Sequence, residues 1–440
     1  MSQYQLLKSR RFIPLFWTQF LGAFNDNVYK NALVILIVFQ DTTLYGLTSN
    51  MIVTASAGIF ILPFFLFSAT AGQLADKYEK SMLIKQVKLL EVTIMALAVF
   101  GFFWQNTLLL IVLLFLMGSQ STLFGPLKYG ILPQHLREQE LMGGNGLIQM
   151  GTFLAILLGI MTGGLLIAVQ QGHLIIATTV LTIACLGLFS SLFIPKAPAA
   201  DPNIKINWNI ITQTWRTMQY AIENKSVFIA ILAISWFWFV GATYLSQFPA
   251  YTKNVLGSNE QVVTLLLTMF SIGIGVGSVL CEKLSSGRIE LGLVPLGALG
   301  ISLFSIDVYF ASQHFVTLAL PPGRLGVSGL LEDFASWRML IDLLLIGLCG
   351  GFYIVPLFAM VQQRSAAHRR ARVIAANNVL NALFMVASAV GTIGLLKWGV
   401  SIPGIFLILG ILSAVVCSLL FSLSPEFIQR FAIWLRLKTD

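Results

Sequence analysis

Charged residues are scarce in this chain of 440 residues: Asp, Glu, Lys and Arg together make up 10% of it. A typical soluble domain carries about 25%. Apolar residues reach 57% instead, and the mean hydropathy is +0.84. This composition excludes a soluble globular protein and predicts an integral membrane protein that crosses the bilayer several times.

Cysteine is also scarce, and no two cysteines form a CxxC pair, so the sequence predicts neither a disulfide framework nor a metal site.

The motifs of several enzyme classes are missing as well. Without GxxxxGK[ST] we expect no ATP-driven pump, and no HxxxxD acyl-transfer motif is present. The glycine-rich stretch at 273–277 lies inside an apolar run and not in a nucleotide-binding turn. We therefore expect no enzyme and no cofactor.

Apolar runs of spanning length dominate the chain, and they predict an all-α membrane protein of twelve transmembrane helices. Six runs precede a polar linker at 195–225 and six follow it, so we expect two six-helix halves, residues 1–194 and 226–440, the second ending in an interfacial tail. The runs lie at roughly 12–39, 51–75, 81–104, 107–128, 143–169, 173–194, 226–250, 260–281, 291–312, 338–361, 373–396 and 402–423.

The net charge of +9 does not indicate a nucleic-acid partner, because the basic residues lie at the ends of the apolar runs. Placing the N-terminus in the cytoplasm puts 22 of the 27 lysines and arginines on that side, including Lys77, Lys80, Lys85 and Lys88. The positive-inside rule therefore predicts that both termini are cytoplasmic. The opposite side holds only Lys253, Arg324, Arg338 and Lys397.

The linker contains one amphipathic stripe, with apolar residues three or four positions apart: Trp208, Ile211, Trp215, Met218 and Ile222. This spacing predicts a helix with one apolar face. Two interpretations remain open at this point. The helix lies on the inner membrane surface, as tryptophan and nearby basic residues favour, or it packs under the bundle.

The first apolar run, 12–39, carries polar residues at its centre: Asn25, Asp26, Asn27, Lys30 and Asn31. Asp26 lies about 21 Å along a helix that begins at Phe12, near the middle of the membrane. One such charge costs about 2.5–3.5 kcal/mol there. Either Asp26 and Lys30 form an ion pair on one helix face, or they line a transport pathway, which is the interpretation we favour.

The two halves of the sequence resemble each other. Asp76-Lys77 and Glu282-Lys283 stand 206 residues apart, each pair after the second run of its half. Pro126 matches Pro356, and Asn145 matches Asn377, at offsets of 230 and 232. Such near-constant offsets indicate duplicated six-helix halves.

The stretch AGQLADKYEK, 71–80, resembles the signature loop of the major facilitator transporters, whose plan is two parallel six-helix repeats. Gly72, Asp76, Lys77 and Lys80 fit that signature. The resemblance implies a major facilitator fold with a substrate site between the halves. It also implies that these residues, with Glu282 and Lys283, act in gating by charge and dipole contacts at helix ends.

Three stretches resemble one branch of these transporters, the bacterial lysophospholipid transporters: FNDNVYKNALVIL (24–36), FGPLKYGILPQ (124–134) and SWFWFVGATYLSQFPAY (235–251). The resemblance implies an inner-membrane flippase that moves lysophosphatidylethanolamine and related lysolipids to the cytoplasmic leaflet by alternating access, for reacylation. A separate acyltransferase or acyl-carrier synthetase is the implied protein partner.

The same resemblance implies a site for the lipid. Asp26 and Asn27 occupy its first motif and Lys128 and Tyr129 its second; we expect Asp26 to attract the ammonium of the headgroup and Lys128 the phosphate. Further candidates for the polar path are Lys30, Glu91, Asn145 and Gln149. The aromatic run 236–239 either lines a gap for the acyl chain or faces lipid.

Two other functions fit the same residues. A proton-coupled carrier of a small polar metabolite or siderophore would use Asp26 or Glu91 as its proton site. A membrane anchor for a separate acyltransferase would transport nothing.

Overall fold

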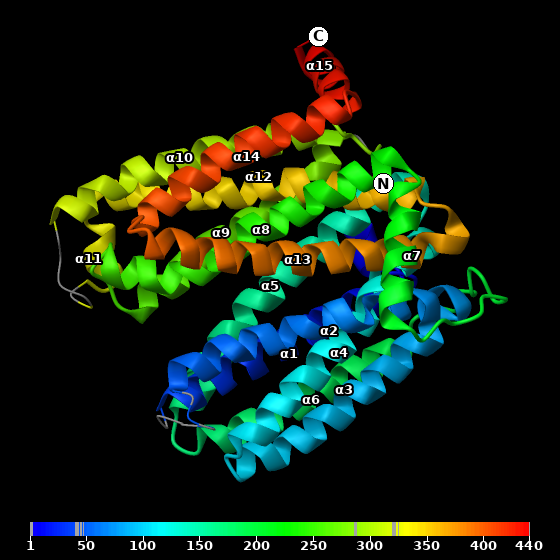
Figure 1. Ribbon diagram of the computed structural model, residues 1–440, viewed down its shortest axis with the longest axis horizontal. Coiled ribbons are helices and arrows are strands. Elements are labelled where there is room, and N and C mark those ends of the chain that lie inside the picture. Colours follow the sequence, from blue (N-terminus) through cyan, green and yellow to red (C-terminus); the bar gives the residue numbers. More distant parts are fainter. Residues whose placement is uncertain are drawn as a thin grey trace. The chain divides into compact units, whose positions relative to one another are not determined.

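The computed structural model describes residues 3–39, 44, 46, 48–285, 288–318, 323 and 325–439, and α-helices dominate these residues (Figure 1). Arg324, one of the four basic residues expected on the outer side, lies outside them. The long helices are α1 (Ile13–Phe39), α2 (Ser49–Lys77), α3 (Lys80–Phe103), α4 (Thr107–His135), α5 (Leu141–Ala168), α6 (Gly172–Ser191), α8 (Lys225–Asn254), α9 (Glu260–Ser285), α10 (Leu293–Leu318), α12 (Phe334–Arg364), α13 (Arg370–Lys397) and α14 (Ile402–Leu423). The shorter ones are α7 (Ile210–Ile222), α11 (Val327–Leu331) and α15 (Glu426–Thr439), with 3-10 turns at Gln3–Lys8, Glu138–Glu140 and Ala367–Arg369.

Eleven helices in the described part of the chain are long and apolar enough to cross a membrane. Helix α1, of 27 residues, completes the expected twelve by its length. It differs from the others in the polar segment around Asp26, which lowers its hydropathy. The prediction of an all-α membrane protein is therefore confirmed.

The chain divides into two compact units. Unit 1 comprises residues 1–144, 154–227 and 362–382, and unit 2 comprises 145–153, 228–361 and 383–440. Each unit takes in a short segment from the other side of the linker, so the division into halves at 195–225 stays a prediction.

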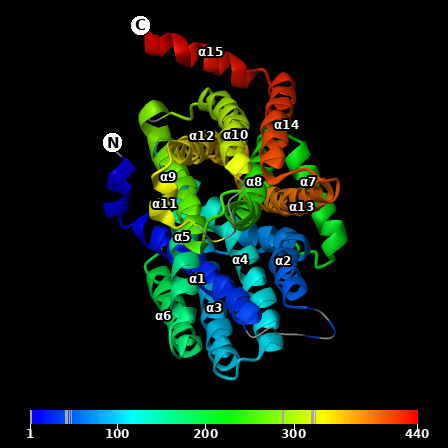
Figure 2. The same cartoon turned by 90° about the vertical axis from the view of Figure 1, so that its left-hand side faces the viewer.

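Within each unit the helices pack in pairs. In unit 1, α2 packs on α4, α3 packs on α4 and α6, and α1 packs on α6 (Figure 2). The buried apolar core of this unit includes Tyr29, Phe102 and Met117, which come from α1, α3 and α4. In unit 2, α10 packs on α14, and α15 contacts both of them.

Glycines let the helices of unit 1 approach one another closely. A methyl group placed on Gly159 would lie 2.7 Å from the Phe24 carbonyl oxygen, and one on Gly163 would lie 2.6 Å from that of Val28. Helices α1 and α5 therefore touch backbone to backbone at these positions, in the manner of small-residue contacts in membranes. The close contact fixes the position of the polar segment of α1 against α5.

The glycine-rich stretch 273–277 has the same role in unit 2. A methyl group on Gly273 or Gly277 would lie about 2 Å from the carbonyl oxygens of Leu344 and Leu348 in α12. The glycines of α12 at positions 347 and 351 face α9 in return. The stretch is thus a helix-crossing site, which agrees with the prediction that it is not a nucleotide-binding turn.

The turn between α2 and α3 is shaped by Glu79, which caps α3. Its carboxylate accepts hydrogen bonds from the backbone N–H groups of Ser81, at 2.9 Å, and Met82, at 2.8 Å. A third comes from the N–H of Ala197 in the linker, at 2.6 Å. Burial alone would raise the pKa of Glu79, but these hydrogen bonds outweigh it and lower the pKa below its usual value. The cap therefore holds the start of α3 and the start of the linker together.

Helix α7 turns its apolar stripe away from α2, and its place on the membrane surface stays a prediction. Its buried residues are Gln213, Thr217 and Ala221, and it packs on α2. The apolar stripe faces the other way and is exposed over most of its length, with Ile211 83% exposed and Trp215 68% exposed. The helix therefore does not bury its apolar face under the bundle.

We predict that Gly163→Ala lowers the stability of the folded protein by about 1–3 kcal/mol, because the new methyl group meets backbone atoms of α1 that cannot move independently. Gly58→Ala in α2 is the matched control, since a methyl group there meets nothing within 4 Å. It should be neutral or slightly stabilising. Thermal unfolding of the two purified variants in detergent measures the difference; equal midpoints would contradict the close α1–α5 contact.

Candidate functional site

A cluster of buried polar side chains joins α1, α3 and α4 inside unit 1. Its centre is Glu91, which forms an ion pair with Lys88 at 2.6 Å. Glu91 also accepts hydrogen bonds from Asn25 Nδ2, at 3.1 Å, and Gln120 Nε2, at 3.0 Å. All four side chains are buried. In this conformation Glu91 is therefore neutralised by Lys88 and hydrogen-bonded by Asn25 and Gln120.

Asp26 lies beside this cluster and is satisfied on one oxygen only. Ser121 Oγ donates to Asp26 Oδ2 at 2.6 Å, and Ser121 Oγ lies 3.3 Å from Gln120 Oε1. Asp26 Oδ1 is buried and has no hydrogen-bond partner among the described residues. A carboxylate oxygen buried without a donor is costly, and it is therefore the part of this cluster best suited to receive a cationic ligand.

Lys30 is not in contact with Asp26. Among the described residues no ion pair within 4.0 Å joins the two, and the Lys30 ammonium lies 4.3 Å from the ring centroid of Phe60 instead. In this conformation Asp26 and Lys30 therefore do not form a contact ion pair. The Lys30 ammonium is held by a cation–π contact with Phe60. Its charge lies near Asp26, but the two groups do not touch.

The helix that carries Ser121, α4, carries Lys128 two turns farther along. The Lys128 ammonium lies 4.6 Å from the ring centroid of Tyr129, which is itself buried. The Lys88 ammonium of the polar cluster lies 5.0 Å from the ring centroid of Phe124, one turn before Lys128. The cluster that begins at α1 therefore extends along α4 toward Lys128, although no hydrogen bond or ion pair among the described residues joins Lys128 to the carboxylate of α1 directly.

Two asparagines of α13 add unsatisfied polar atoms to unit 1. A methyl group on Gly125 of α4 would lie 2.6 Å from Asn378 Nδ2, so Asn378 faces the helix that carries Ser121 and Lys128. Among the described residues, Asn378 Nδ2 and both side-chain polar atoms of Asn377 are buried without a hydrogen-bond partner. Buried polar groups are normally paired, so these atoms mark a place where a polar ligand could bind.

Three other expected residues of the polar path are buried as well. Asn27 is buried and donates to the Ala23 carbonyl of its own helix, at 2.7 Å. Asn145 and Gln149 are buried in α5 but belong to unit 2.

The aromatic run is divided between burial and partial exposure. Trp236 and Phe237 are buried, and Trp236 Nε1 donates to Ser413 Oγ at 3.3 Å. These two rings pack within unit 2 and do not face lipid.

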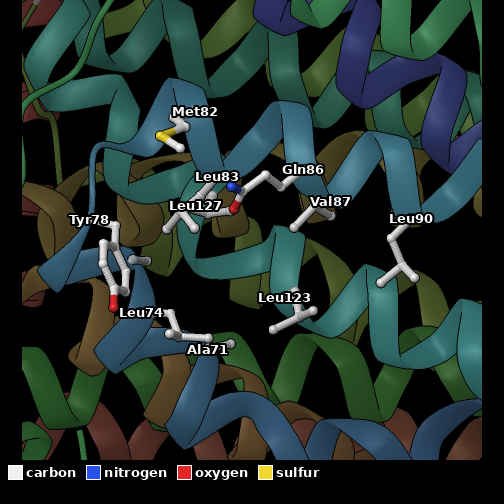
Figure 3. A pocket seen from close by; sticks show the side chains of 11 residues that line it. Ala71, Leu74, Tyr78, Met82, Leu83, Gln86, Val87, Leu90, Leu123 and Leu127 are labelled. Atoms are coloured by element: carbon white, nitrogen blue, oxygen red, sulfur yellow. The ribbon is translucent and has the colours of Figure 1, made fainter.

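An apolar groove of about 400 Å³ opens on unit 1 between α2, α3 and α4 (Figure 3). Figure 3 shows Val87 and Leu90 of α3 facing Leu123 of α4, with Ala71 of α2 beside them and Tyr78 at one end. Its lining suits a hydrocarbon chain. The groove is lined by Ala71, Leu74, Ala75, Tyr78, Met82, Leu83, Gln86, Val87, Leu90, Leu123 and Leu127.

A second charged contact joins the end of α2 to the start of α13. Arg372 Nε donates to Asp76 Oδ2 at 2.9 Å, and the backbone N–H of Ala371 donates to Asp76 Oδ1 at 3.2 Å. Asp76 and Arg372 are both buried. Gly72 permits the approach, because a methyl group there would lie 2.8 Å from Ala375 Cβ. An acid at the N-terminus of a helix is favoured by the helix dipole as well as by the arginine.

Among the described residues, no hydrogen bond or ion pair joins the side chain of Lys77 or Lys80 to Asp76 or Arg372. Lys77 lies 5.8 Å from the ring centroid of its neighbour Tyr78. Lys80 is buried, and its ammonium has no hydrogen-bond partner among the described residues. Glu282 and Lys283 lie in the last turn of α9, in unit 2, with Lys283 exposed.

A comparison with family models decides the relationship of the chain to known proteins. The model described as Major Facilitator Superfamily matches residues 15–383. The chain belongs to the Major Facilitator Superfamily. It is accordingly a multi-pass membrane transporter, and its family gives no indication of an enzyme.

Relatives and solved structures within the superfamily agree with this. The chain is 28% identical over 354 residues to the lysophospholipid transporter LplT of Escherichia coli O1:K1, a match that covers 79% of this chain and 78% of that protein. LplT of E. coli O157:H7 matches equally. Among solved structures, the human organic anion transporter MFSD10 has a TM-score of 0.70 at 12% identity, covering 93% of this chain and 99% of that one. The E. coli fucose:proton symporter FucP has a TM-score of 0.68 at 16% identity, covering 94% and 98%.

Several residues of the polar cluster in this superfamily member were not expected from its sequence. The positive-inside pattern places Lys88 among the basic residues outside the membrane. In the structure Lys88 is buried, and its charge is matched by Glu91. The signal was available, since Lys88 and Glu91 are three apart on one helix face within an apolar run. No such signal marks Gln120, Ser121 and Asn378. For a single polar side chain on a long helix, the sequence does not show which neighbouring helix the side chain faces.

We predict that Lys88→Met lowers the free energy of unfolding by about 3–5 kcal/mol, because it leaves the Glu91 carboxylate buried without its counter-charge. The double variant Lys88→Met, Glu91→Gln should recover most of that loss, since the amide can still bond to Asn25 and Gln120. Thermal unfolding in detergent compares the variants. A double variant as unstable as the sum of the single changes would show that the pair does not act as a unit.

Proposed function

We propose that this transporter moves lysophospholipids, lysophosphatidylethanolamine among them, across the inner membrane of a bacterium to the cytoplasmic leaflet, where they are reacylated. The single observation that carries the proposal is the half-satisfied carboxylate of Asp26, buried in a membrane-spanning helix. It lies in the first motif that resembles the lysophospholipid transporters, and the similarity to LplT supports the same cargo.

In this proposal the headgroup binds along the polar side of α1 and α4. The ammonium of phosphoethanolamine binds Asp26 Oδ1, the oxygen that has no donor among the described residues. The phosphate binds Lys128, and the amides of Asn377 and Asn378 offer further hydrogen bonds. Lys30, held against the Phe60 ring, adds a positive charge one turn after Asp26 on the same helix. A zwitterionic ligand suits such a region because it brings one charge of each sign.

The acyl chain needs an apolar path, and the groove between α2, α3 and α4 supplies one (Figure 3). On α4 the groove residue Leu127 directly precedes Lys128, so the apolar and polar faces of the helix lie side by side. On α3 the same holds for Val87 and Lys88. A single groove of about 400 Å³ suits a lipid with one chain better than a lipid with two.

The basic ends of the spans face the cytoplasm in this proposal, so that both termini and the Asp76–Arg372 contact lie on that side. Formation and release of that contact gate alternating access, with Gly72, Lys77, Lys80, Glu282 and Lys283 at the same ends of the helices. A separate acyltransferase or acyl-carrier synthetase uses the delivered lipid.

Asp26→Asn is expected to reduce uptake of labelled lysophosphatidylethanolamine into proteoliposomes by about tenfold or more, because a charge-assisted contact to the ammonium becomes a neutral one. Asp26→Glu should retain part of the activity. Glu260→Gln, which changes an exposed carboxylate at the start of α9, is the control and should leave uptake unchanged.

Uptake by the Asp26→Asn variant at the rate of the unmodified protein would overturn the role of Asp26. The same vesicles separate the alternatives. A proton-coupled carrier of polar solutes would take up neither lysolipid nor diacyl lipid, and an uncoupler would stop its uptake of a polar solute. A non-transporting anchor would take up neither lipid nor solute.

Leu123→Trp should fill part of the groove and lower uptake of long-chain lysolipids by about tenfold, since each methylene removed from an apolar site costs about 0.8 kcal/mol. Short-chain lysolipids should be affected less. The matched control is Leu116→Trp, an exposed position on the same helix that does not line the groove. A Leu123→Trp variant with the chain-length preference of the unmodified protein would exclude the groove from the path.

A further inference from the structure

The linker before α7 has no regular helix, yet it is hydrogen-bonded to the basic end of unit 1 along its length. The carbonyl of Ala197 accepts from Lys80 N–H at 3.0 Å, while its own N–H donates to Glu79. Farther along, the side-chain amide of Gln73 pairs with the backbone of Asn207, donating at 3.0 Å and accepting at 2.8 Å. These contacts attach the linker to the ends of α2 and α3 at two separate places.

Between those two places the linker takes part in the Asp76–Arg372 contact. The backbone carbonyl of Asp76 accepts from Ala200 N–H at 2.9 Å and from Asp201 N–H at 2.8 Å. The Asp201 carboxylate in turn accepts from Arg372 Nη2 at 3.0 Å. Arg372 therefore lies between two carboxylates, one from α2 and one from the linker. A second anion on a buried guanidinium strengthens the contact, because it neutralises charge that burial makes costly.

Helix α7 extends this link. The Tyr220 ring centroid lies 5.3 Å from Arg372 Cζ and 4.8 Å from Arg369 Cζ. Glu223, at the end of the helix, forms an exposed ion pair with Arg369 at 2.8 Å. The linker and α7 thus contact the start of α13 through three side chains, whereas the other face of α7 carries the exposed apolar stripe.

The exposed stripe has the chemistry of a membrane-surface helix. Figure 1 shows α7 crossing the long helices of unit 1 at a steep angle near their ends. A helix with apolar and aromatic residues on one face, cations beside them, and an axis across the spans fits the surface of an anionic leaflet. The stripe residues exposed by 54–83% are Trp208, Ile211, Trp215 and Ile222, and the exposed cations around them are Lys205, Arg216 and Lys225.

We propose that α7 binds the surface of the cytoplasmic leaflet through this stripe, with a preference for anionic phospholipid, and that its binding keeps the Asp76–Arg372 contact formed through Asp201. The linker is then a lipid-dependent third component of that contact. This inference uses the proposed orientation in the membrane but does not depend on the transported cargo.

The lipid surface is tested first. In the full chain with Cys185→Ser, a polarity-sensitive fluorophore is attached at Ile211→Cys or, as the matched control, at Thr212→Cys, an exposed neighbour about 100° around the helix. In vesicles with brominated acyl chains, the label at 211 should be quenched about twofold or more relative to that at 212. The difference should be larger with phosphatidylglycerol than with phosphatidylcholine alone. Equal quenching would overturn the binding of the stripe to lipid.

The coupling is tested with a cysteine at the contact itself. Ala371→Cys places a thiol where the native side chain is fully buried, and its labelling by a water-soluble maleimide reports opening. Asp201→Asn should raise that labelling rate about tenfold, the effect of losing one charged hydrogen bond. Glu223→Gln, which loses only an exposed ion pair, should change it by about twofold or less.

A third arm joins the two measurements. Trp208→Ser with Trp215→Ser, or replacement of phosphatidylglycerol by phosphatidylcholine, should speed labelling when Asp201 is present and add little in the Asp201→Asn variant. A labelling rate that depends neither on the lipid composition nor on Asp201 would overturn the coupling. No lysolipid is measured here, so this failure is distinct from a failure of the proposed cargo.

Discussion

The structure depends on one constraint: a charge inside a membrane-spanning bundle must be matched by an opposite charge or by hydrogen bonds. Glu91 meets it fully, with Lys88, Asn25 and Gln120 around its carboxylate. Asp26, one helix away, meets it only in part, with a serine hydroxyl on one oxygen. Glu91 therefore holds α1, α3 and α4 together, whereas Asp26 remains available to a ligand.

The same constraint acts at the basic end of unit 1. Arg372 is buried there, and its charge is matched by Asp76 and Asp201 together. A contact of this kind is strong while all partners are in place and costly once one of them leaves, so it suits a transition between two discrete states. Because one of the two acids belongs to the linker, the segment between α6 and α8 also takes part in the contact that the proposed transport cycle breaks.

Much of the fold could be predicted from the sequence alone. Twelve apolar runs and their basic flanks predict a polytopic helical protein, and the helices lie close to the predicted ranges, as with α3 at Lys80–Phe103. The signature around Asp76 indicated the family, which the match to the Major Facilitator Superfamily confirms. The residues that pair with the buried charges could not be predicted. Arg372 lies 296 residues from Asp76, and an ion pair at such a separation leaves no periodic signal in either helix.

The sequence by itself determined where the long apolar helices lie in the chain, because a spanning helix is indicated by local hydropathy over about 20 residues. It also determined that Asp26 lies deep in an apolar run. Only the tertiary structure decided that Lys88, not Lys30, supplies the cation of the buried cluster, and that the apolar stripe of α7 faces outward. Both outcomes depend on how a helix is rotated about its axis, and that rotation is set by close contacts such as Gly163 against Val28, which exist only once the helices have packed.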